Sequence, residues 1–378
     1  MAVVPVASAL LGPVVGLAAA KAVTSHFSVM LFAAGPPVVK EATFENLTKE
    51  QLGGWEIHGR NGTIDNVVNT ELEAFLEIRR FLSFLPSNIF SLPASVQTND
   101  SVDRREEELI RIIPKRRGRM YDMRRVIGLI VDLDGRNTDG GDRKSTFFEI
   151  GVTWGSNVIT GLSRMAGKTV GVIANDCTVN GGAIDAFGSQ KVTRFVNLCN
   201  HFRIPILNLV DQPGSLAERM ATIRHGATAM AAIYNASIPI YTVIVRRAFG
   251  VAGSVFADPE DGRNTRVAWP SADWGSLPLE GGIEAAYKRQ LDAAGSKDPE
   301  ARNQLMNELL EKFEPVRNPI RYANKFGVEE IVDPRDTRPL ICDWVTHAYE
   351  HVLPQLVTLT AASYGLDGKL SSGRGYKL

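Results

Sequence analysis

The sequence predicts an α/β fold with a mainly parallel sheet. Apolar, β-rich runs at 169–174, 206–210 and 240–245 alternate with segments of helical periodicity at 189–202 and 217–236. Helices of this length are the crossovers that join parallel strands. Two further observations agree with this class: glycine-containing turns follow several of the strands, and one strand–turn–helix pattern occurs twice.

The repeated pattern is the most informative feature of the chain. A Pro-led apolar run at 4–11 is followed by Gly-Leu-Ala at 16–18, and a second run at 238–245 is followed by Gly-Val-Ala at 250–252. A strand, a turn and a helix that opens on glycine let backbone N–H groups point at an anion. The repeat therefore predicts two related units, each with one oxyanion site. Because the first copy begins at Val4, we expect the first unit to lack its front half.

Composition narrows the function classes. The 378 residues are 44% hydrophobic and 22% charged, and 42 basic residues balance 42 acidic ones. A formal net charge of zero disfavours nucleic acid as a partner. The basic cluster at 115–125 is interpreted as a solvated linker face, with a phosphate contact to a bound cofactor as the alternative. Three widely spaced cysteines without a CxxC motif favour a reduced, cytoplasmic location.

Residues 2–20 carry no charge and must be weighed as a targeting or membrane segment. No basic region precedes the apolar run, as a signal peptide requires. Two prolines and two glycines also interrupt it, which is unusual for a spanning helix. A buried strand and helix explain the run better, so we expect no membrane insertion.

Three regions are expected along the chain: a first block at 1–90, a linker at 91–118 and a second block at 119–378. Thr70 or Asn69 can cap a helix that runs to Leu85. Its apolar residues fall on one broad face, namely Leu72, Phe75, Leu76, Ile78, Phe81, Leu82 and Leu85. Further helices are expected at 302–313 and 343–359.

Three turns in the second block are candidates for a binding site. They lie at 180–183, 211–214 and 246–250, each after an expected strand. Glycine allows sharp turning and close approach to a ligand, and turns at the carboxyl ends of parallel strands share one crevice. A single turn of this kind is usually structural, but three in order, one of them repeated in the first block, indicate a site.

Other familiar catalytic patterns are missing from the sequence. It contains no GxSxG elbow, no Walker A motif and no GxGxxG after a strand. His347, Glu350 and His351 match the HxxEH pattern of zinc proteases, but no later Glu offers the third ligand. We interpret these residues as an exposed helix face and expect no metal.

In these features, residues 119–343 resemble the second crotonase-like domain of the carboxyltransferase (β) subunits of biotin-dependent acyl-CoA carboxylases, such as propionyl-CoA carboxylase. Residues 3–85 look like the rear half of the first such domain. The resemblance covers nearly the whole chain in the correct order, which makes it far more specific than one motif. Its main runs lie at 147–150, 158–161, 171–175, 182–185, 211–214, 224–227, 246–250 and 268–270.

The resemblance implies a crotonase-like α/β fold, with one partial and one complete copy, and a biotin-dependent carboxyl transfer. Carboxybiotin on a carrier protein would release CO2, and the freed ureido nitrogen would take the α-proton of an acyl-CoA. The thioester enolate would then attack CO2. Negative charge develops on two oxygens, which calls for two preorganised sets of hydrogen-bond donors rather than a catalytic triad.

The resemblance also implies site residues. Backbone N–H groups of Gly16 and Leu17 would serve one oxyanion, and those of Val251 and Ala252 the other, with Gly182 and Ala183 as further candidate donors. The expected cofactor-binding set is Gly182, Ala183, Gly214, Gly250, Gly253 and Ser254.

The sequence departs from the family at several of these positions. Leu17 and Val251 replace the second glycine of the family's usual pair. Gly253 and Ser254 replace an aromatic residue and an acid that often shape the acyl pocket. These departures leave the acyl group open.

The partners implied are a biotin carboxyl carrier, a biotin carboxylase and further copies of the chain in a hexamer. The expected missing front half adds a hypothesis, a second polypeptide that completes the first block. Two alternatives stay open at this stage. One is the decarboxylase α subunit of a biotin-dependent sodium-pumping complex, and the other is a non-catalytic scaffold, supported by Leu17 and Val251 at the glycine positions.

Overall fold

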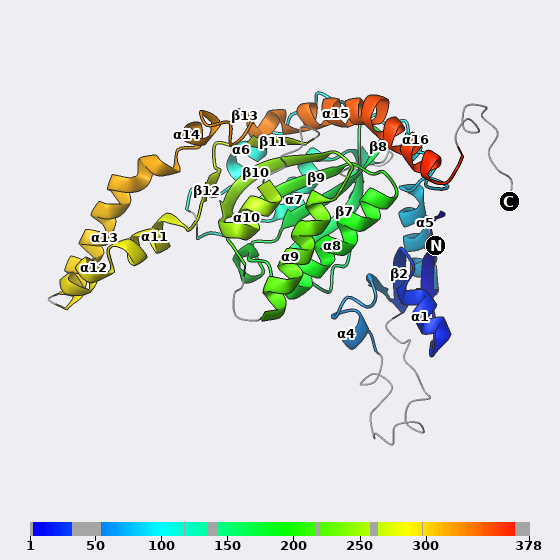
Figure 1. Cartoon of the computed structure of the whole chain (residues 1–378), viewed down its shortest axis with the longest axis horizontal. Coiled ribbons are helices and arrows are strands. Elements are labelled where there is room, and N and C mark those ends of the chain that lie inside the picture. Colours follow the sequence, from blue (N-terminus) through cyan, green and yellow to red (C-terminus); the bar gives the residue numbers. More distant parts are fainter. Residues whose placement is uncertain are drawn as a thin grey trace, which may run out of the picture.

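The computed structural model describes residues 3–31, 54–116, 118–134, 143–215, 220–257, 264–296 and 298–366. Its main body is a mixed sheet in the order β13-β11-β10-β9-β8-β7-β6, with β12 also paired to β10 (Figure 1). The strands are β6 Phe148–Ile150, β7 Val158–Met165, β8 Lys168–Asn175, β9 Ile206–Gln212, β10 Ile240–Phe249, β11 Thr265–Ala268, β12 Asp273–Gly275 and β13 Glu330–Ile331. Strands β8 to β11 are parallel and β6, β7 and β8 are antiparallel. The predicted α/β class with a mainly parallel sheet is confirmed.

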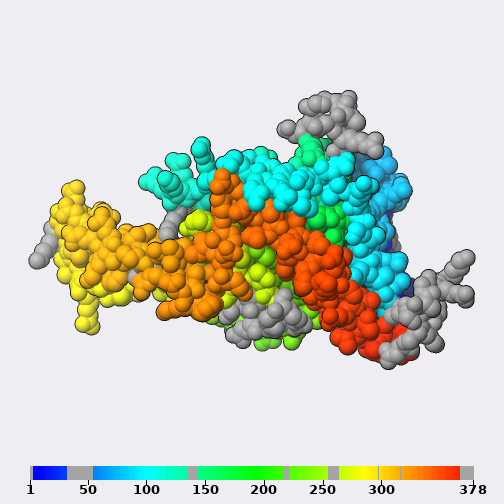
Figure 2. Space-filling view, turned by 90° about the horizontal axis from the view of Figure 1, so that it is seen from above, coloured from blue at the N-terminus to red at the C-terminus, as the bar shows by residue number. Residues whose placement is uncertain are grey.

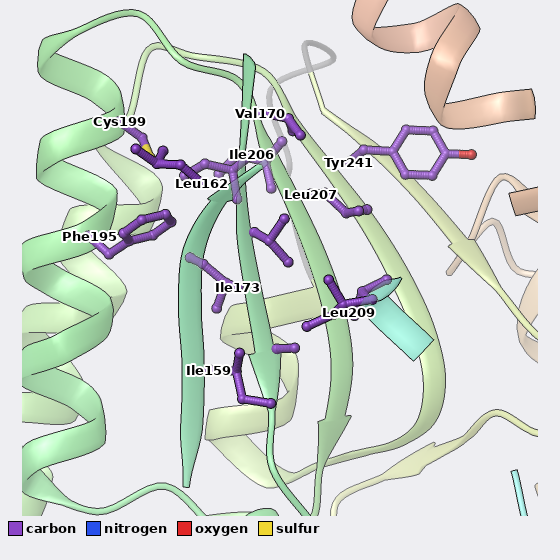
Figure 3. Packing of buried hydrophobic residues seen from close by; sticks show 14 of the residues in the cluster. Ile159, Leu162, Val170, Ile173, Phe195, Cys199, Ile206, Leu207, Leu209 and Tyr241 are labelled. Atoms are coloured by element: carbon purple, nitrogen blue, oxygen red, sulfur yellow. The ribbon is translucent and has the colours of Figure 1, made fainter. Parts of the chain in front are cut away.

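Helices cover both faces of this sheet. They are α7 Met123–Ile130, α8 Ala186–His201, α9 Met220–Tyr234, α10 Gly250–Ala257, α15 Thr337–His347 and α16 Leu353–Ser363. Phe195 and Cys199 of α8 pack on β7, β8 and β9 (Figure 3). Gly171 permits this approach, because a Cβ there would lie 2.7 Å from the Cys199 sulfur. On the other face Tyr241 meets Trp344 of α15 edge to face, with ring centroids 5.4 Å apart.

In the described residues of the first block, a small parallel sheet packs with helices α1, α4 and α5. Its order is β1-β2-β3. The elements are β1 Ala7–Leu10, α1 Leu17–Val23, β2 Phe27–Leu31, α4 Trp55–His58, β3 Asn66–Val68 and α5 Glu71–Ser83. Thr70 caps α5 as predicted, since its hydroxyl accepts a hydrogen bond of 3.1 Å from the N–H of Glu73.

The broad apolar face predicted for α5 is only partly buried. Ala74 and Phe81 are completely buried. Four residues on the other side of the helix are exposed, at 68% for Leu72, 49% for Phe75, 55% for Leu76 and 40% for Leu82. The apolar residues of α5 are therefore divided between a buried and an exposed side, because the core takes only the stripe that faces β1 and β2.

One hydrophobic core runs through both blocks. Phe27 of β2 stacks on Phe81 of α5 at 4.7 Å and meets Phe148 of β6 edge to face at 5.6 Å. The segment between the blocks holds one short helix, α6 Leu109–Ile112, and the small hairpin β4 Leu133–Asp134 with β5 Lys144–Ser145 follows α7. The division of the chain into two blocks and a linker, with boundaries at 90 and 118, stays a prediction. The shared hydrophobic core joins the two blocks.

An arm projects from the body (Figures 1 and 2). It consists of α11 Leu279–Ala286, α12 Lys288–Gly295, α13 Pro299–Phe313, a 3₁₀ turn Glu314–Arg317 and α14 Pro319–Ala323. Its helices enclose a separate small core of Ile283, Leu291 and Leu309. Helix α13 includes the helix expected at 302–313.

The last helix differs from the expectation in one respect. The segment expected at 343–359 is divided between α15 and α16, which a π-helical turn Ala348–Val352 connects. Among the described residues, no helix is both long enough and apolar enough to span a membrane.

Candidate functional site

The repeated pattern found in the sequence has the same local geometry in both copies. Strand β1 leads to Gly16 and α1, and strand β10 leads to Gly250 and α10. The φ angles of the two glycines are +61° and +63°. This backbone region is strained for any residue with a Cβ, so glycine is required at both turns. The predicted repetition of strand, turn and helix is confirmed.

The residues after each glycine begin a helix. The first N–H groups of a helix have no acceptor within it, and the helix dipole adds positive potential there. Leu17 follows one glycine, and Val251 and Ala252 follow the other. Both turns therefore have the geometry needed to present backbone donors to a developing negative charge. Their assignment as oxyanion donors stays a prediction.

Both turns lie at the surface of the single chain. Leu17 is 72% exposed and Val251 is 69% exposed. Helices α8 and α9 lie between α1 and α10 in Figure 1. One chain therefore does not bring its two turns into a common cavity.

The three turns of the second block do converge. The N–H of Ile184 donates to the carbonyl of Gly214 at 3.1 Å, which joins the turns after β8 and β9. The Arg247 guanidinium donates to the carbonyl of Gly181 at 2.6 Å and to Asp211 at 2.6 Å, which joins the turn after β10 to both. The expectation that the three turns converge is confirmed, and a crevice shared by them stays a prediction.

Asp211 is the centre of this junction. Its carboxylate is completely buried and accepts hydrogen bonds from Arg246 at 2.8 Å, from Arg247 and from the Tyr121 hydroxyl at 3.0 Å. Burial alone would raise the pKa of Asp211, but the hydrogen bonds from Arg247 and Arg246 outweigh it and lower the pKa below its usual value. Burial and the nearby Asp211 charge raise the pKa of Tyr121.

This buried ion cluster was not predicted from the sequence. Asp211, Arg246 and Arg247 were interpreted only as turn residues. The signal was present, because an Asp at the end of one strand and an Arg pair at the end of the next become neighbours in a parallel sheet. The cluster fixes the direction in which β10 enters the Gly250 turn.

Gly182 and Ala183 do not serve as donors in this conformation. The N–H of Gly182 donates to the carbonyl of Val179 at 2.9 Å, and that of Ala183 donates to the carbonyl of Asn180 at 3.1 Å. The donor role considered for this pair is therefore wrong for the observed conformation. A binding role for the pair stays a prediction, as does that of Gly214, whose φ is +131°.

A pocket of about 640 Å³ lies beside the second turn. Gly250, Val251 and Gly253 line it, with Trp274 and Tyr322, whose rings meet edge to face at 4.5 Å. The expected cofactor-binding residues Gly250 and Gly253 thus face one cavity with aromatic walls. Their contact with a cofactor stays a prediction.

Gly253 itself has a packing role. A Cβ at this position would lie 2.4 Å from the carbonyl carbon of Ala248. Helix α10 therefore lies too close to β10 to admit a side chain there, least of all the aromatic residue of the family pattern. Ser254 lies in α10, and its side chain is outside the part of the chain that the structure describes.

Part of the basic cluster at 115–125 is structural. Arg124 pairs with Glu149 at 2.7 Å and with Asp176 at 2.5 Å. These contacts attach α7 to β6 and to the end of β8, so this residue is not a solvated linker residue. Within the described ranges, no group of three or more His, Cys, Asp or Glu side chains is arranged to hold a metal ion.

Comparison with known proteins shows which protein family the chain resembles. Residues 1–355 match the family model described as carboxyl transferase domain. The chain is 34% identical to the carboxyltransferase subunit of propionyl-CoA carboxylase from Haloferax mediterranei, over 89% of this chain and 64% of that protein. It is 33% identical to the methylmalonyl-CoA carboxyltransferase 12S subunit of Propionibacterium freudenreichii subsp. shermanii, over 89% of this chain and 63% of that protein.

A solved structure agrees with these relatives. The transcarboxylase 12S hexamer with methylmalonyl-coenzyme A and methylmalonic acid bound matches with a TM-score of 0.78 and 32% identity, over 92% of this chain and 66% of that one. The fold is therefore the crotonase-like α/β fold predicted from the resemblance. The chain spans about two thirds of the length of these relatives. None of the comparisons supports the second polypeptide expected from the sequence.

Proposed function

Because this chain belongs to the carboxyl transferase domain family, we propose that it is the carboxyltransferase component of a biotin-dependent acyl-CoA carboxylase. The observation that carries the proposal is the pair of equivalent turns, in which Gly16 and Gly250 have φ angles of +61° and +63°. Two equivalent donor sites fit a reaction in which two oxygens acquire negative charge. A reaction with one such oxygen would need only one site.

The backbone is the catalytic element of this proposal. The N–H groups of Gly16 and Leu17 would donate to the thioester oxygen as the acyl-CoA loses its α-proton. The N–H groups of Val251 and Ala252 would donate to the ureido oxygen of biotin. Preorganised donors of this kind contribute roughly 10²–10³-fold each to the rate. The side chains of Leu17 and Val251 point to solvent, so they leave the donor geometry intact.

The pocket beside α10 fits biotin. Biotin has a compact, uncharged ring with one carbonyl oxygen, and the pocket combines the Gly250 turn with the rings of Trp274 and Tyr322. Residues 250–252 would hold the ureido oxygen, while the aromatic walls would position the ring. When bound, biotin supplies the CO2 and the basic nitrogen, and the chain supplies orientation and charge stabilisation.

The exposed turns favour a site shared between copies of the chain. The apolar side chains of Leu17 and Val251 are both open to solvent in one chain, and each turn offers donors to only one of the two oxygens. We therefore propose that the first turn of one copy faces the second turn of another, in a hexamer like that of the 12S subunit. A biotin carrier and a biotin carboxylase would complete the system.

The same proposal places the enzyme in a reduced, cytoplasmic compartment, because Cys177, Cys199 and Cys342 are all free and buried. Carboxylation is favoured over the sodium-pump decarboxylase, because the relatives described above are named carboxylase and carboxyltransferase subunits. The repeated turn geometry also argues against a scaffold, which would not need positive φ at two equivalent glycines.

The test is a carboxylation assay with a panel of acyl-CoAs. The full chain is mixed with biotin carrier, biotin carboxylase, ATP and labelled bicarbonate, and each acyl-CoA is followed by fixation of label. We expect label in at least one acyl-CoA, dependent on this chain and on biotinylated carrier. No transfer to any member of the panel, with a chain that is folded and oligomeric, would contradict the proposal.

A further inference from the structure

A second cavity lies at the end of the strands opposite to the three turns of the second block. It has a volume of about 490 Å³ and lies between α5, residues 96–99 and the β7–β8 hairpin. Gly167, which lines it, precedes β8, whereas the Gly182 turn follows that strand. Eight strand residues at about 3.3 Å each separate the two edges by roughly 25 Å.

Three arginines line this cavity: Arg80 of α5, Arg143 before β5 and Arg164 of β7. Arg80 donates to the carbonyls of Phe147 at 3.1 Å and Thr146 at 3.4 Å. Arg164 donates to the carbonyl of Ser83 at 2.7 Å and makes longer contacts of 3.5 Å with the carbonyls of Ala94 and Gly167 and the hydroxyl of Thr169. Among the described residues, neither Arg80 nor Arg164 has a carboxylate within ion-pair distance. Their charges are therefore held in place by neutral oxygens.

Aromatic rings fix the orientation of two of these guanidinium groups. The Cζ atom of Arg80 lies 5.5 Å from the ring centre of Phe148, and that of Arg164 lies 5.0 Å from the ring centre of Phe84. A guanidinium that is stacked on a ring and bonded to carbonyls is preorganised to bind an oxyanion through its remaining N–H groups. Burial lowers the pKa of Arg164, and the nearby Tyr349, Asp132 and Asp134 oppose this shift.

Two acidic residues, Asp132 and Asp134, line the same cavity and lie close enough to Arg164 to offset part of its charge. Asp132 is buried and bonded to Arg338 at 2.8 Å and to the N–H of Gly167 at 2.7 Å. Asp134 lies at the exposed rim. Arg143 has one longer contact, 3.6 Å, with Asp100. With three arginines against these two aspartates, the lining keeps a formal excess of one positive charge.

We propose that this cavity is a binding site for a small phosphate-bearing anion. The anion would accept hydrogen bonds from Arg80, Arg143 and Arg164. Because α5 belongs to the first block and β7 to the second, it would bridge the two blocks. The proposal does not depend on the carboxyl transfer, whose second-block candidate residues lie at the other end of the strands.

The experiment measures anion binding to the full chain by calorimetry and by thermal unfolding at constant ionic strength, with chloride as the reference salt. Inorganic phosphate and AMP are the two probes, so that a free phosphate and a nucleotide phosphate can be told apart. We expect saturable binding of at least one probe and a rise in Tm with its concentration. No saturable binding of either probe would overturn the proposal.

Two variants and one control locate the site. Arg80→Gln and Arg143→Gln should each weaken binding about tenfold or more, since each removes one charge-assisted hydrogen bond. Arg125→Gln is the matched control, because Arg125 is an exposed arginine paired with Glu108 on another surface. Wild-type affinity in both cavity variants, or an equal loss in Arg125→Gln, would overturn the assignment. The Tm of each variant in chloride shows that it is folded.

Discussion

The donor role of the second turn can be tested by removing one backbone hydrogen. Val251→Pro deletes the N–H at this position, and proline fits the first turn of a helix, where its fixed φ is already helical. Val251→Ala is the matched control, because it removes the side chain and keeps the N–H. Since the Val251 side chain is 69% exposed, its loss should change the free energy of unfolding by no more than about 0.5 kcal/mol.

The expected effect on catalysis is much larger than the effect on stability. Loss of one oxyanion donor raises the barrier by about 2.7–4 kcal/mol, which corresponds to a decrease in kcat of roughly 10²–10³-fold. Val251→Ala should stay within a few-fold of wild type. The assay is carboxyl transfer with carrier and carboxylase in excess, at saturating acyl-CoA, on variants whose Tm and oligomeric state match wild type.

The first turn offers an independent copy of the same test. Leu17→Pro and Leu17→Ala should show the same contrast, because Leu17 follows Gly16 as Val251 follows Gly250. If both proline variants retain wild-type kcat, the backbone donors are not catalytic and the reasoning from the repeated turns fails. If only one is affected, the reaction uses a single donor site and the two-oxyanion argument is refuted.

Three further predictions concern stability. Gly253→Ala should lower the free energy of unfolding by about 1–3 kcal/mol, because the added methyl group overpacks against β10. Gly281→Ala lies at an open helical position and should raise the free energy of unfolding by about 0.5–1 kcal/mol. Equal unfolding free energies of the two variants in urea would contradict the packing argument. Asp211→Asn should lower the free energy of unfolding by about 3–5 kcal/mol, because it leaves buried guanidinium charge uncompensated. Glu108→Gln removes one partner of an exposed ion pair and should lower it by less than about 1 kcal/mol. Similar Tm values for the two variants would refute this expectation. Burial lowers the pKa of Lys191 from 10.5 to about 7, so the unfolded chain binds more protons between these pH values and stability should rise with pH across that window. Denaturation of Lys191→Met over the same window should lack this component, and parallel pH curves for the two proteins would exclude it.

Patterns confined to short segments predicted the structure well. The cap at Thr70 and the strands that became β8, β9 and β10 depend on propensity and spacing within a few residues. The two positive-φ glycines, Gly16 and Gly250, were found because the same short pattern occurs twice. Each of these features is determined mainly by local backbone geometry.

Features that depend on contacts distant in sequence were predicted less well. Periodicity marked the apolar residues of α5 but not which of them the core would cover, since that depends on where β1 and β2 lie. The Asp211 cluster joins residues from three separate segments, so no window of sequence contains it. The hydrogen bonds that occupy the N–H groups of Gly182 and Ala183 depend on the detailed turn conformation, which residue types do not specify.

The helical arm has a mechanical consequence. Its small core of Ile283, Leu291 and Leu309 is separate from the core of the body. Arg317 pairs with Glu280 inside the arm at 2.7 Å and reaches Asp273 of the body at 3.7 Å. An appendage with its own interior can tilt as a lever while the sheet remains rigid. Since Tyr322 of this arm lines the pocket beside α10, a movement of the arm relative to the sheet would change the width of that pocket.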